Sequence, residues 1–177
     1  MFRVLIVLVL MIPSVVFAAD KEEKNLLRAA KNGGIQMVKM LVGKVDIDIQ
    51  DEKGMTPLAH AAWHGHKEVV LFLVEQGADV NIASKDGNTP LMRTIQFCRY
   101  HMFRPILLKG ANVNAIRNDG NTPLHLAARN GCVDITKMLL ENGADRDVKN
   151  DRDQTPLDLA KKANHRNIIK LFKPPNP

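Results

Sequence analysis

The sequence has few aromatic residues: one Trp, one Tyr and six Phe among 177 residues. A core of this composition is built mainly from Leu, Val and Ala, so a fold with a large aromatic core is not favoured. The net charge is +6, but the basic residues are scattered among 19 acidic ones. Because nucleic-acid binders gather Lys and Arg on one face, we expect no nucleic-acid partner, only a bias toward acidic partners.

The sequence also lacks the motifs of the common enzyme classes. It contains no Gly-rich phosphate loop, no HExxH, no Cys-x-x-Cys and no nucleophile elbow. We therefore predict that the protein is not an enzyme, has no catalytic or metal-binding residues and binds no cofactor.

No apolar run reaches the ~18 residues that a membrane-spanning helix needs. The apolar run over residues 4–12 follows Arg3, and small residues that end at Ala18 come after it. This pattern predicts a signal peptide over residues 1–18, cleaved before Ala19, and therefore an exported protein with no membrane span after cleavage. The alternative is that this segment is retained as an N-terminal anchor.

One motif recurs at a constant spacing of 33 residues. Thr-Pro-Leu begins at Thr56, Thr89, Thr122 and Thr155, and a second series consists of Gly77, Gly110 and Gly143. Two independent series with one period indicate a repeat protein, in which each unit is stable only when stacked on its neighbours.

The pattern within one unit predicts two helices. Thr56 can cap a first helix that has Pro57 at its first position, and Gly65 suits its left-handed end. Apolar residues then recur at helical spacing over residues 69–74, which predicts a second helix, and residues 79–88 are expected to form an extended finger.

These motifs resemble the ankyrin repeat, most completely in NDGNTPLHLAARNGCVDITKMLLENGADRDVKN, residues 118–150. The resemblance implies an all-α solenoid of about five helix-turn-helix units with β-hairpin fingers, over residues 19–173. The repeats are numbered one to five and span about 24–50, 51–83, 84–117, 118–150 and 151–173, before a tail at 174–177. Only His125 keeps the His that follows Thr-Pro-Leu in the family.

The family binds proteins through its fingers and the concave face of its first helices. The chain is similar to small exported ankyrin proteins of bacteria, which implies a monomeric scaffold for another protein in the periplasm or outside the cell. The matching positions, all expected to be exposed, are Met55, Trp63, His64, Lys85, Asp86, Asn88, Gln96, Phe97, Tyr100, Ile116, Asp119, Asn121, Arg129 and Asn130. Trp63 and Phe97 are the expected anchors, although both could instead fold inward.

Two alternative functions remain open. The chain could inhibit a co-exported enzyme by covering its active site. It could also hand metal or haem to a redox enzyme, because His64, His66, Cys98, His101 and Cys132 are suitable ligand types from neighbouring repeats.

The two cysteines could form a disulfide, since export favours oxidation. Neighbouring helices pack about 8–10 Å apart, whereas bridged Cα atoms lie within ~7 Å. A disulfide therefore requires repeat three to be distorted. Cys98 occupies the position of Gly65 and Gly131, and Pro105 falls inside the second helix, so we predict that this helix is shortened or bent.

Overall fold

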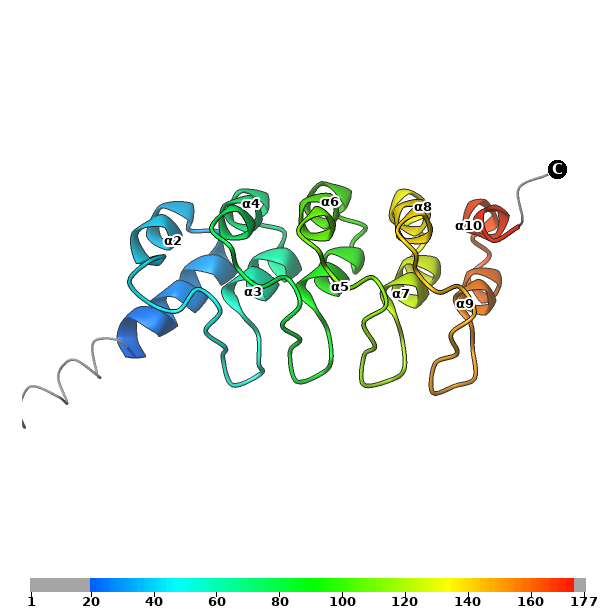
Figure 1. Ribbon diagram of the computed structural model, residues 1–177, viewed down its shortest axis with the longest axis horizontal. Helices are drawn as coiled ribbons and strands as arrows, with labels where there is room; N and C mark the ends of the chain where they lie inside the picture. Colours follow the sequence, from blue (N-terminus) through cyan, green and yellow to red (C-terminus); the bar gives the residue numbers. More distant parts are fainter. Residues whose placement is uncertain (1–19, 174–177) are drawn as a thin grey trace, which may run out of the picture.

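The computed structural model describes residues 20–173, which form a row of antiparallel helix pairs (Figure 1). Residues 20–32 are helical and are followed by α2 (Ile35–Leu41). The remaining pairs are α3 (Pro57–His64) with α4 (Lys67–Glu75), α5 (Pro90–Ile95) with α6 (Tyr100–Leu108), α7 (Pro123–Asn130) with α8 (Val133–Glu141), and α9 (Pro156–Lys162) with α10 (Arg166–Leu171). The predicted signal peptide lies outside the described residues.

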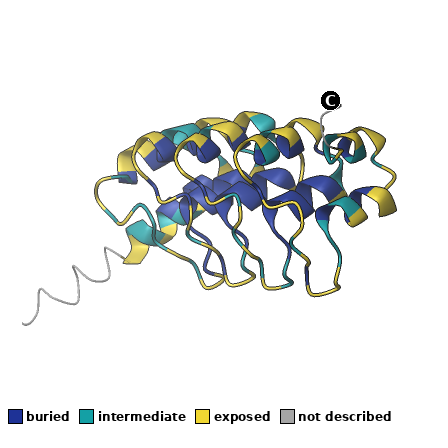
Figure 2. Ribbon diagram, turned by 45° about the vertical axis from the view of Figure 1, so that its right-hand side comes forward, coloured by how far each residue is buried: buried dark blue, intermediate teal, exposed yellow. Residues whose placement is uncertain are grey.

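The first helices of the pairs form an inner layer, the second helices form an outer layer, and the fingers extend beyond the inner layer (Figure 1). The inner helices of the middle repeats are almost entirely buried, whereas the outer helices alternate between buried and exposed residues (Figure 2). None of the helices within residues 20–173 is long and apolar enough to cross a membrane.

Each Thr-Pro-Leu motif begins an inner helix in the predicted way. The Thr56 hydroxyl oxygen accepts a hydrogen bond from the Ala59 N–H at 3.1 Å, and Pro57 stands at the first helical position. The helix ends at Gly65, whose φ of 88° lies in the left-handed region that favours glycine. These local signals explain why the helix boundaries repeat with the sequence.

His125 adds a link between neighbouring repeats. Its Nε2 donates to the Gln154 carbonyl at 2.9 Å, and its Nδ1 accepts from the Thr122 N–H at 3.2 Å. Burial lowers the pKa of His125, so the ring is neutral and can accept at Nδ1 while it donates at Nε2. Thr122 and His125 are thus a structural pair.

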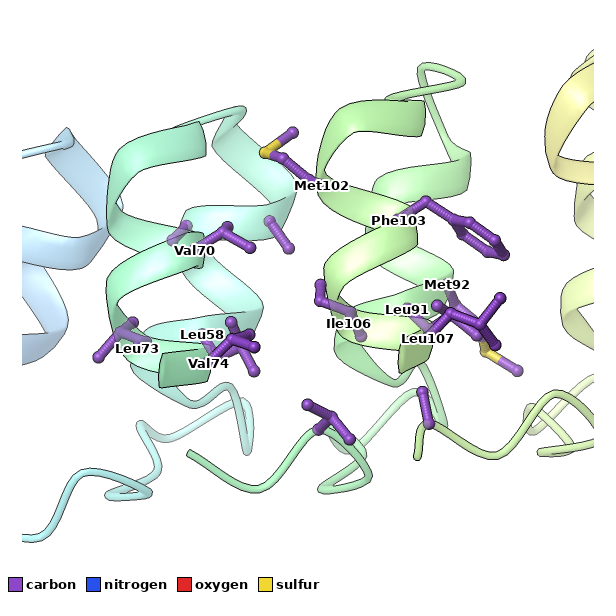
Figure 3. Close-up of a cluster of buried hydrophobic side chains, with 14 of the residues drawn as sticks. Leu58, Val70, Leu73, Val74, Leu91, Met92, Met102, Phe103, Ile106 and Leu107 are labelled. Atoms are coloured by element: carbon purple, nitrogen blue, oxygen red, sulfur yellow. The ribbon is translucent and has the colours of Figure 1, made fainter. Parts of the chain in front are cut away.

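The core lies between the two layers and continues from one repeat to the next. Leu58 of the inner layer and Val70 and Leu73 of the outer layer have no exposed surface, and Phe103 and Ile106 extend the same cluster into repeat three (Figure 3). Because each apolar face is covered by a neighbouring pair, stacking provides most of the stability of every unit.

The fingers are loops closed by turns. Residues 20–173 contain no β-strand, and their isolated β-bridge joins Val42 to Val45. In the finger of repeat three, Ser84 N–H donates to the Asn88 carbonyl at 3.0 Å, and Lys85 N–H donates to the Lys53 carbonyl of the preceding finger at 2.9 Å. Single hydrogen bonds of this kind connect fingers without forming a sheet.

A row of side chains at the base of the fingers also crosses the first three repeat boundaries. The side-chain oxygens of Asp48, Asn81 and Asn114 accept from backbone N–H groups of the next repeat at 2.8–3.2 Å. These residues are spaced by 33, so the period fixes hydrogen bonds as well as apolar contacts.

Of the two outcomes predicted for the second helix of repeat three, a shortened or a bent helix, the shortening is wrong. α6 has 9 residues, as α4 and α8 do, although Pro105 lies inside it. Its buried residues Met102, Phe103, Ile106 and Leu107 hold it in the core and offset the hydrogen bond that Pro105 cannot make. The shortening falls instead on α5, which has 6 residues against 8 in α3 and α7.

Candidate protein-binding surface

Two aromatic rings lie together at the end of the inner helices of repeats two and three. The centroids of Trp63 and Phe97 are 6.1 Å apart, and their planes are inclined by 60°. Phe97 is 58% exposed, while Trp63 is half-buried. The position of Phe97 follows from the early end of α5, because Gln96 and Phe97 lie in the turn that replaces the last helical residues.

An arginine covers each ring. The Arg93 guanidinium lies 5.0 Å from the centroid of Trp63, and that of Arg99 lies 4.4 Å from the centroid of Phe97. Arg99 is itself held in place, since it donates to the carbonyls of Ala62, at 2.9 Å, and Trp63. Such cation–π contacts restrict the rings, although more than half of the Phe97 surface stays exposed to solvent.

The Arg93 side chain is buried and connects Trp63 of repeat two to the finger of repeat three. It donates to the Ser84 hydroxyl at 2.8 Å and to both carboxylate oxygens of Asp86 at 2.9 Å. Burial alone would raise the pKa of Asp86, but hydrogen bonds from Ser84 and Asn88 and the charge of Arg93 lower it to about 2. Asp86 is therefore ionised and fixed at neutral pH.

Two hollows lie between the fingers and the inner helices. One, of about 420 Å³, is lined by Glu52, Lys53, Met55, Trp63, Lys85, Asp86 and Arg93. The other, of about 300 Å³, lies in repeats four and five and is lined by polar residues that include Arg129, Arg152 and Lys162. The first hollow therefore adjoins the aromatic pair, and the second is rich in positive charge.

A disulfide joins the two cysteines behind this surface. The Cys98 and Cys132 sulfurs are bonded, and their Cα atoms are 5.2 Å apart. Cys98 has the positive φ, 49°, that its glycine equivalents have, and Cys132 lies just before α8. The Cα atoms of Cys98 and Cys132 are thus closer together than the axes of two packed helices, because the disulfide joins the ends of helices and not their faces.

At the position of Cys132, other repeats have a side chain that donates a hydrogen bond to a carbonyl of the preceding repeat. His66 donates to the Lys31 carbonyl at 2.8 Å, Arg99 to the Ala62 carbonyl at 2.9 Å, and His165 to the Ala128 carbonyl at 2.9 Å. Cys132 is the equivalent residue of repeat four. Both cysteines are therefore engaged with each other and do not serve as thiolate ligands, and residues 20–173 contain no group of three potential ligands that could hold a metal ion.

Three of the residues expected to be exposed are buried. Met55 is 7%, Asn88 6% and Asn121 5% exposed. Each of them directly precedes a buried Thr-Pro-Leu motif, at the point where the finger leads into the inner helix. The two amide side chains serve the turns: Asn88 donates to Asp86 at 2.7 Å, and Asn121 accepts from Asn150 at 2.9 Å. The prediction of exposure was wrong there, although Met55 lines the first hollow.

Tyr100 is also displaced from the predicted patch. It begins α6, packs against the core and lines a separate hollow with Val133 and Asp134. Asn130 is half-buried, with its amide 3.3 Å from the Ile95 carbonyl, and Asp119 is paired with Arg117 at 2.8 Å. The predicted residues that are exposed are His64, Lys85, Asp86, Gln96, Phe97, Ile116 and Arg129.

Sequence reasoning missed Arg93 and Arg99, which orient the aromatic pair. A signal existed for each. Arg93 stands where repeats four and five have Leu126 and Leu159, so a charged residue had entered a core position. Arg99 stands where repeats two and five have His, so its hydrogen-bonding role could have been read from the period.

The repeated helix pairs, caps and finger links agree with the comparisons with known proteins. The description "Ankyrin repeats (3 copies)" matches residues 26–117, and "Ankyrin repeats (many copies)" matches residues 106–160. The chain belongs to the ankyrin-repeat family. Proteins of this family generally act by protein–protein interaction and are typically non-enzymatic scaffolds.

Curated relatives share short segments with this ankyrin-repeat chain. It is 44% identical over 59 residues to human "Ankyrin repeat domain-containing protein 7", covering 32% of this chain and 23% of that protein. It is 46% identical over 56 residues to mouse "Ankyrin repeat and SAM domain-containing protein 6", covering 30% and 6%. Human "Ankyrin repeat domain-containing protein 29" is 45% identical over 53 residues, covering 29% and 18%. The chain thus spans less than a quarter of the length of these relatives.

Proposed function

We propose that this chain is a monomeric scaffold of about five ankyrin repeats that binds another protein through its inner face and fingers. The observation that carries this proposal is the exposed ring of Phe97 beside Trp63, between two arginines. An apolar residue that is kept in place by its neighbours and left open to water is a suitable anchor for a partner. Neighbouring hollows provide room for the partner's side chains.

Site-specific photo-crosslinking in the source cell tests this proposal, because it captures a partner of any identity. A photoreactive amino acid replaces Phe97 in one variant and Leu108, which is 70% exposed on the outer layer, in a control variant. We expect a discrete crosslinked protein from position 97 and none from position 108. Crosslinking only from position 108, or from neither position, would show that the inner face is not the binding surface.

The identity of the crosslinked protein also decides between a scaffold and an inhibitor. If the partner is an enzyme whose activity falls when the purified chain is added, the inhibitor function is correct. If its activity is unchanged, the scaffold function is supported.

We further propose that the protein is exported to the periplasm or the cell exterior. The apolar segment over residues 4–12 and the disulfide between Cys98 and Cys132 support this, because disulfides persist in oxidising compartments. Intact-mass measurement of the protein from the exported fraction should give a chain that begins at Ala19. A full-length chain in that fraction would indicate a retained anchor, and a chain found only in the cytoplasm would contradict export.

A further inference from the structure

The charges of the inner face differ from those of the chain as a whole. Three cations of the second hollow, Arg129, Arg152 and Lys162, are exposed. Within residues 20–173 none of their side chains forms an ion pair or a hydrogen bond to another side chain. By contrast, Lys137 pairs with Glu141, and Lys149 pairs with Asp153.

The acidic residues of the same face are fewer and partly neutralised. Asp119 is bound by Arg117 at 2.8 Å, and Asp86 is bound by Arg93 at 2.9 Å. Lys53 and Lys85, which line the first hollow, likewise have no ion pair among the described residues. Glu52 and Asp151 are the remaining carboxylates that line the two hollows. The inner face therefore carries more free positive than free negative charge.

The free cations are arranged in the direction of the repeats. Arg129 stands one repeat beyond Gln96, the neighbour of Phe97, and Lys162 stands one repeat beyond Arg129. Since α5, α7 and α9 lie side by side in this order (Figure 1), the equivalent positions Gln96, Arg129 and Lys162 follow one another from repeat three to repeat five. The helices of successive repeats lie about 10 Å apart, and an extended chain covers that distance in about three residues.

We propose that the inner face binds an extended acidic segment of a protein, with one aromatic or large apolar residue on Trp63 and Phe97. Acidic residues about three and six positions from this anchor then lie opposite Arg129 and Lys162. The anchor supplies most of the affinity, because its burial removes apolar surface from water. The carboxylates supply direction and specificity, because they meet Arg129 and Lys162, the unpaired cations of the next two repeats.

This inference rests on the proposed function, since it names the chemistry of the partner of the same surface. Selection from a random peptide library displayed on phage provides a test that assumes no partner. The full chain with its disulfide intact is immobilised, and bound peptides are sequenced. We expect enriched peptides to contain one Trp, Phe, Leu or Met and acidic residues about three and six places away, on the same side in every peptide.

Matched variants connect the selected peptides to the predicted residues. By fluorescence anisotropy, Phe97→Ala should weaken an enriched peptide at least about tenfold, and Arg129→Glu about fivefold or more. Leu108→Ala and Lys109→Glu make the same chemical changes on exposed outer residues and should leave affinity unchanged. Raising the salt concentration should weaken binding to the unmodified protein more than to Arg129→Glu.

The outcomes separate this inference from the proposed function. Enriched peptides that need Phe97 but carry no acidic residues would keep the binding surface and overturn the acidic partner. Enrichment that is equal on the Phe97→Ala variant, or no enrichment, would overturn the inference, while the crosslinking result would still decide the proposed function. Displacement of the peptides by single-stranded DNA at equal concentration would show that the cations recognise polyanions in general, which would also overturn it.

Discussion

Repeats three and four end their inner helices in different ways. In repeat four the turn contains Gly131, and His165 of the next repeat donates to the Ala128 carbonyl at 2.9 Å. A Cβ atom at Gly131 would lie 3.1 Å from that histidine ring. In repeat three the same turn contains Cys98, whose side chain is bonded to the equivalent residue of the next repeat, Cys132.

This comparison shows that the two positions change together. A side chain with positive φ, as at Cys98, is disfavoured by local sterics, and at Gly65 a Cβ would also lie 3.0 Å from Arg99. The residue that faces Cys98 is Cys132, which is smaller than arginine or histidine and is bonded to it. A side chain at position 98 therefore does not meet the close contact that a Cβ atom would meet at Gly65 or Gly131. The same boundary between repeats is thus closed by a hydrogen bond in one case and by a disulfide in the other.

The largest expected effect comes from removing that bond. Cys98→Ser combined with Cys132→Ser should lower the free energy of unfolding by about 3–4 kcal/mol, because the bridge closes a loop with a sequence separation of 34. Urea unfolding of the variant and of the oxidised wild type measures the difference. A loss below about 1 kcal/mol would mean that the boundary is held by apolar stacking alone.

The neighbouring boundary, between repeats two and three, depends on hydrogen bonds from Arg99. Arg99→Ala removes its donation to the Ala62 and Trp63 carbonyls and its contact with Phe97, so we expect a loss of about 2 kcal/mol. Arg104→Ala, at an exposed position in α6, the helix that follows Arg99, should change stability by no more than about 0.5 kcal/mol. Equal effects of the two substitutions in thermal unfolding would argue against this role.

Repeat three can also be converted to the arrangement of repeat four. Cys98→Gly combined with Cys132→His should be about 1–2 kcal/mol more stable than the double serine variant. Glycine relieves the positive φ, and the histidine can donate to the Ile95 carbonyl, which is equivalent to that of Ala128. If the two double variants unfold at the same urea concentration, the hydrogen bond of His165 is not transferable to this boundary.

The smallest expected effect concerns the ion pair of Arg93 with Asp86 in repeat three. Repeat four has Leu126 in place of Arg93. Since the folded pKa of Asp86 is about 2, below its ordinary value of 3.8, its contribution is complete above about pH 4 and is lost as the pH falls toward 2. Its side chain is 52% exposed, so solvent screening reduces this contribution to about 1 kcal/mol.

The pH dependence of stability tests this difference. Asp86→Asn should lower stability by about 1 kcal/mol at neutral pH and have little effect near pH 2. Asp151→Asn is the matched control, because Asp151 is an exposed finger carboxylate without a side-chain partner among the described residues. A pH-independent effect of Asp86→Asn would mean that it reflects lost packing of the finger and not lost charge.

Much of the fold was predictable because its signals are local. Thr56, Pro57 and Gly65 specify one helix through a cap, a first residue and a left-handed end, and their recurrence specifies the family. The candidate site was predictable only in part. The aromatic pair was recognised from its register, but the burial of Asn88 depends on how the finger folds back onto the helix.

The sequence by itself determined the repeat and the helix pairs, because each depends on neighbours within a few residues or on the period of 33. The tertiary structure alone decided that Pro105 leaves α6 at full length, that Cys98 lies within bonding distance of Cys132, and that Arg93 and Arg99 cover Trp63 and Phe97. These outcomes depend on packing between repeats, where burial of several side chains outweighs the preference of one residue.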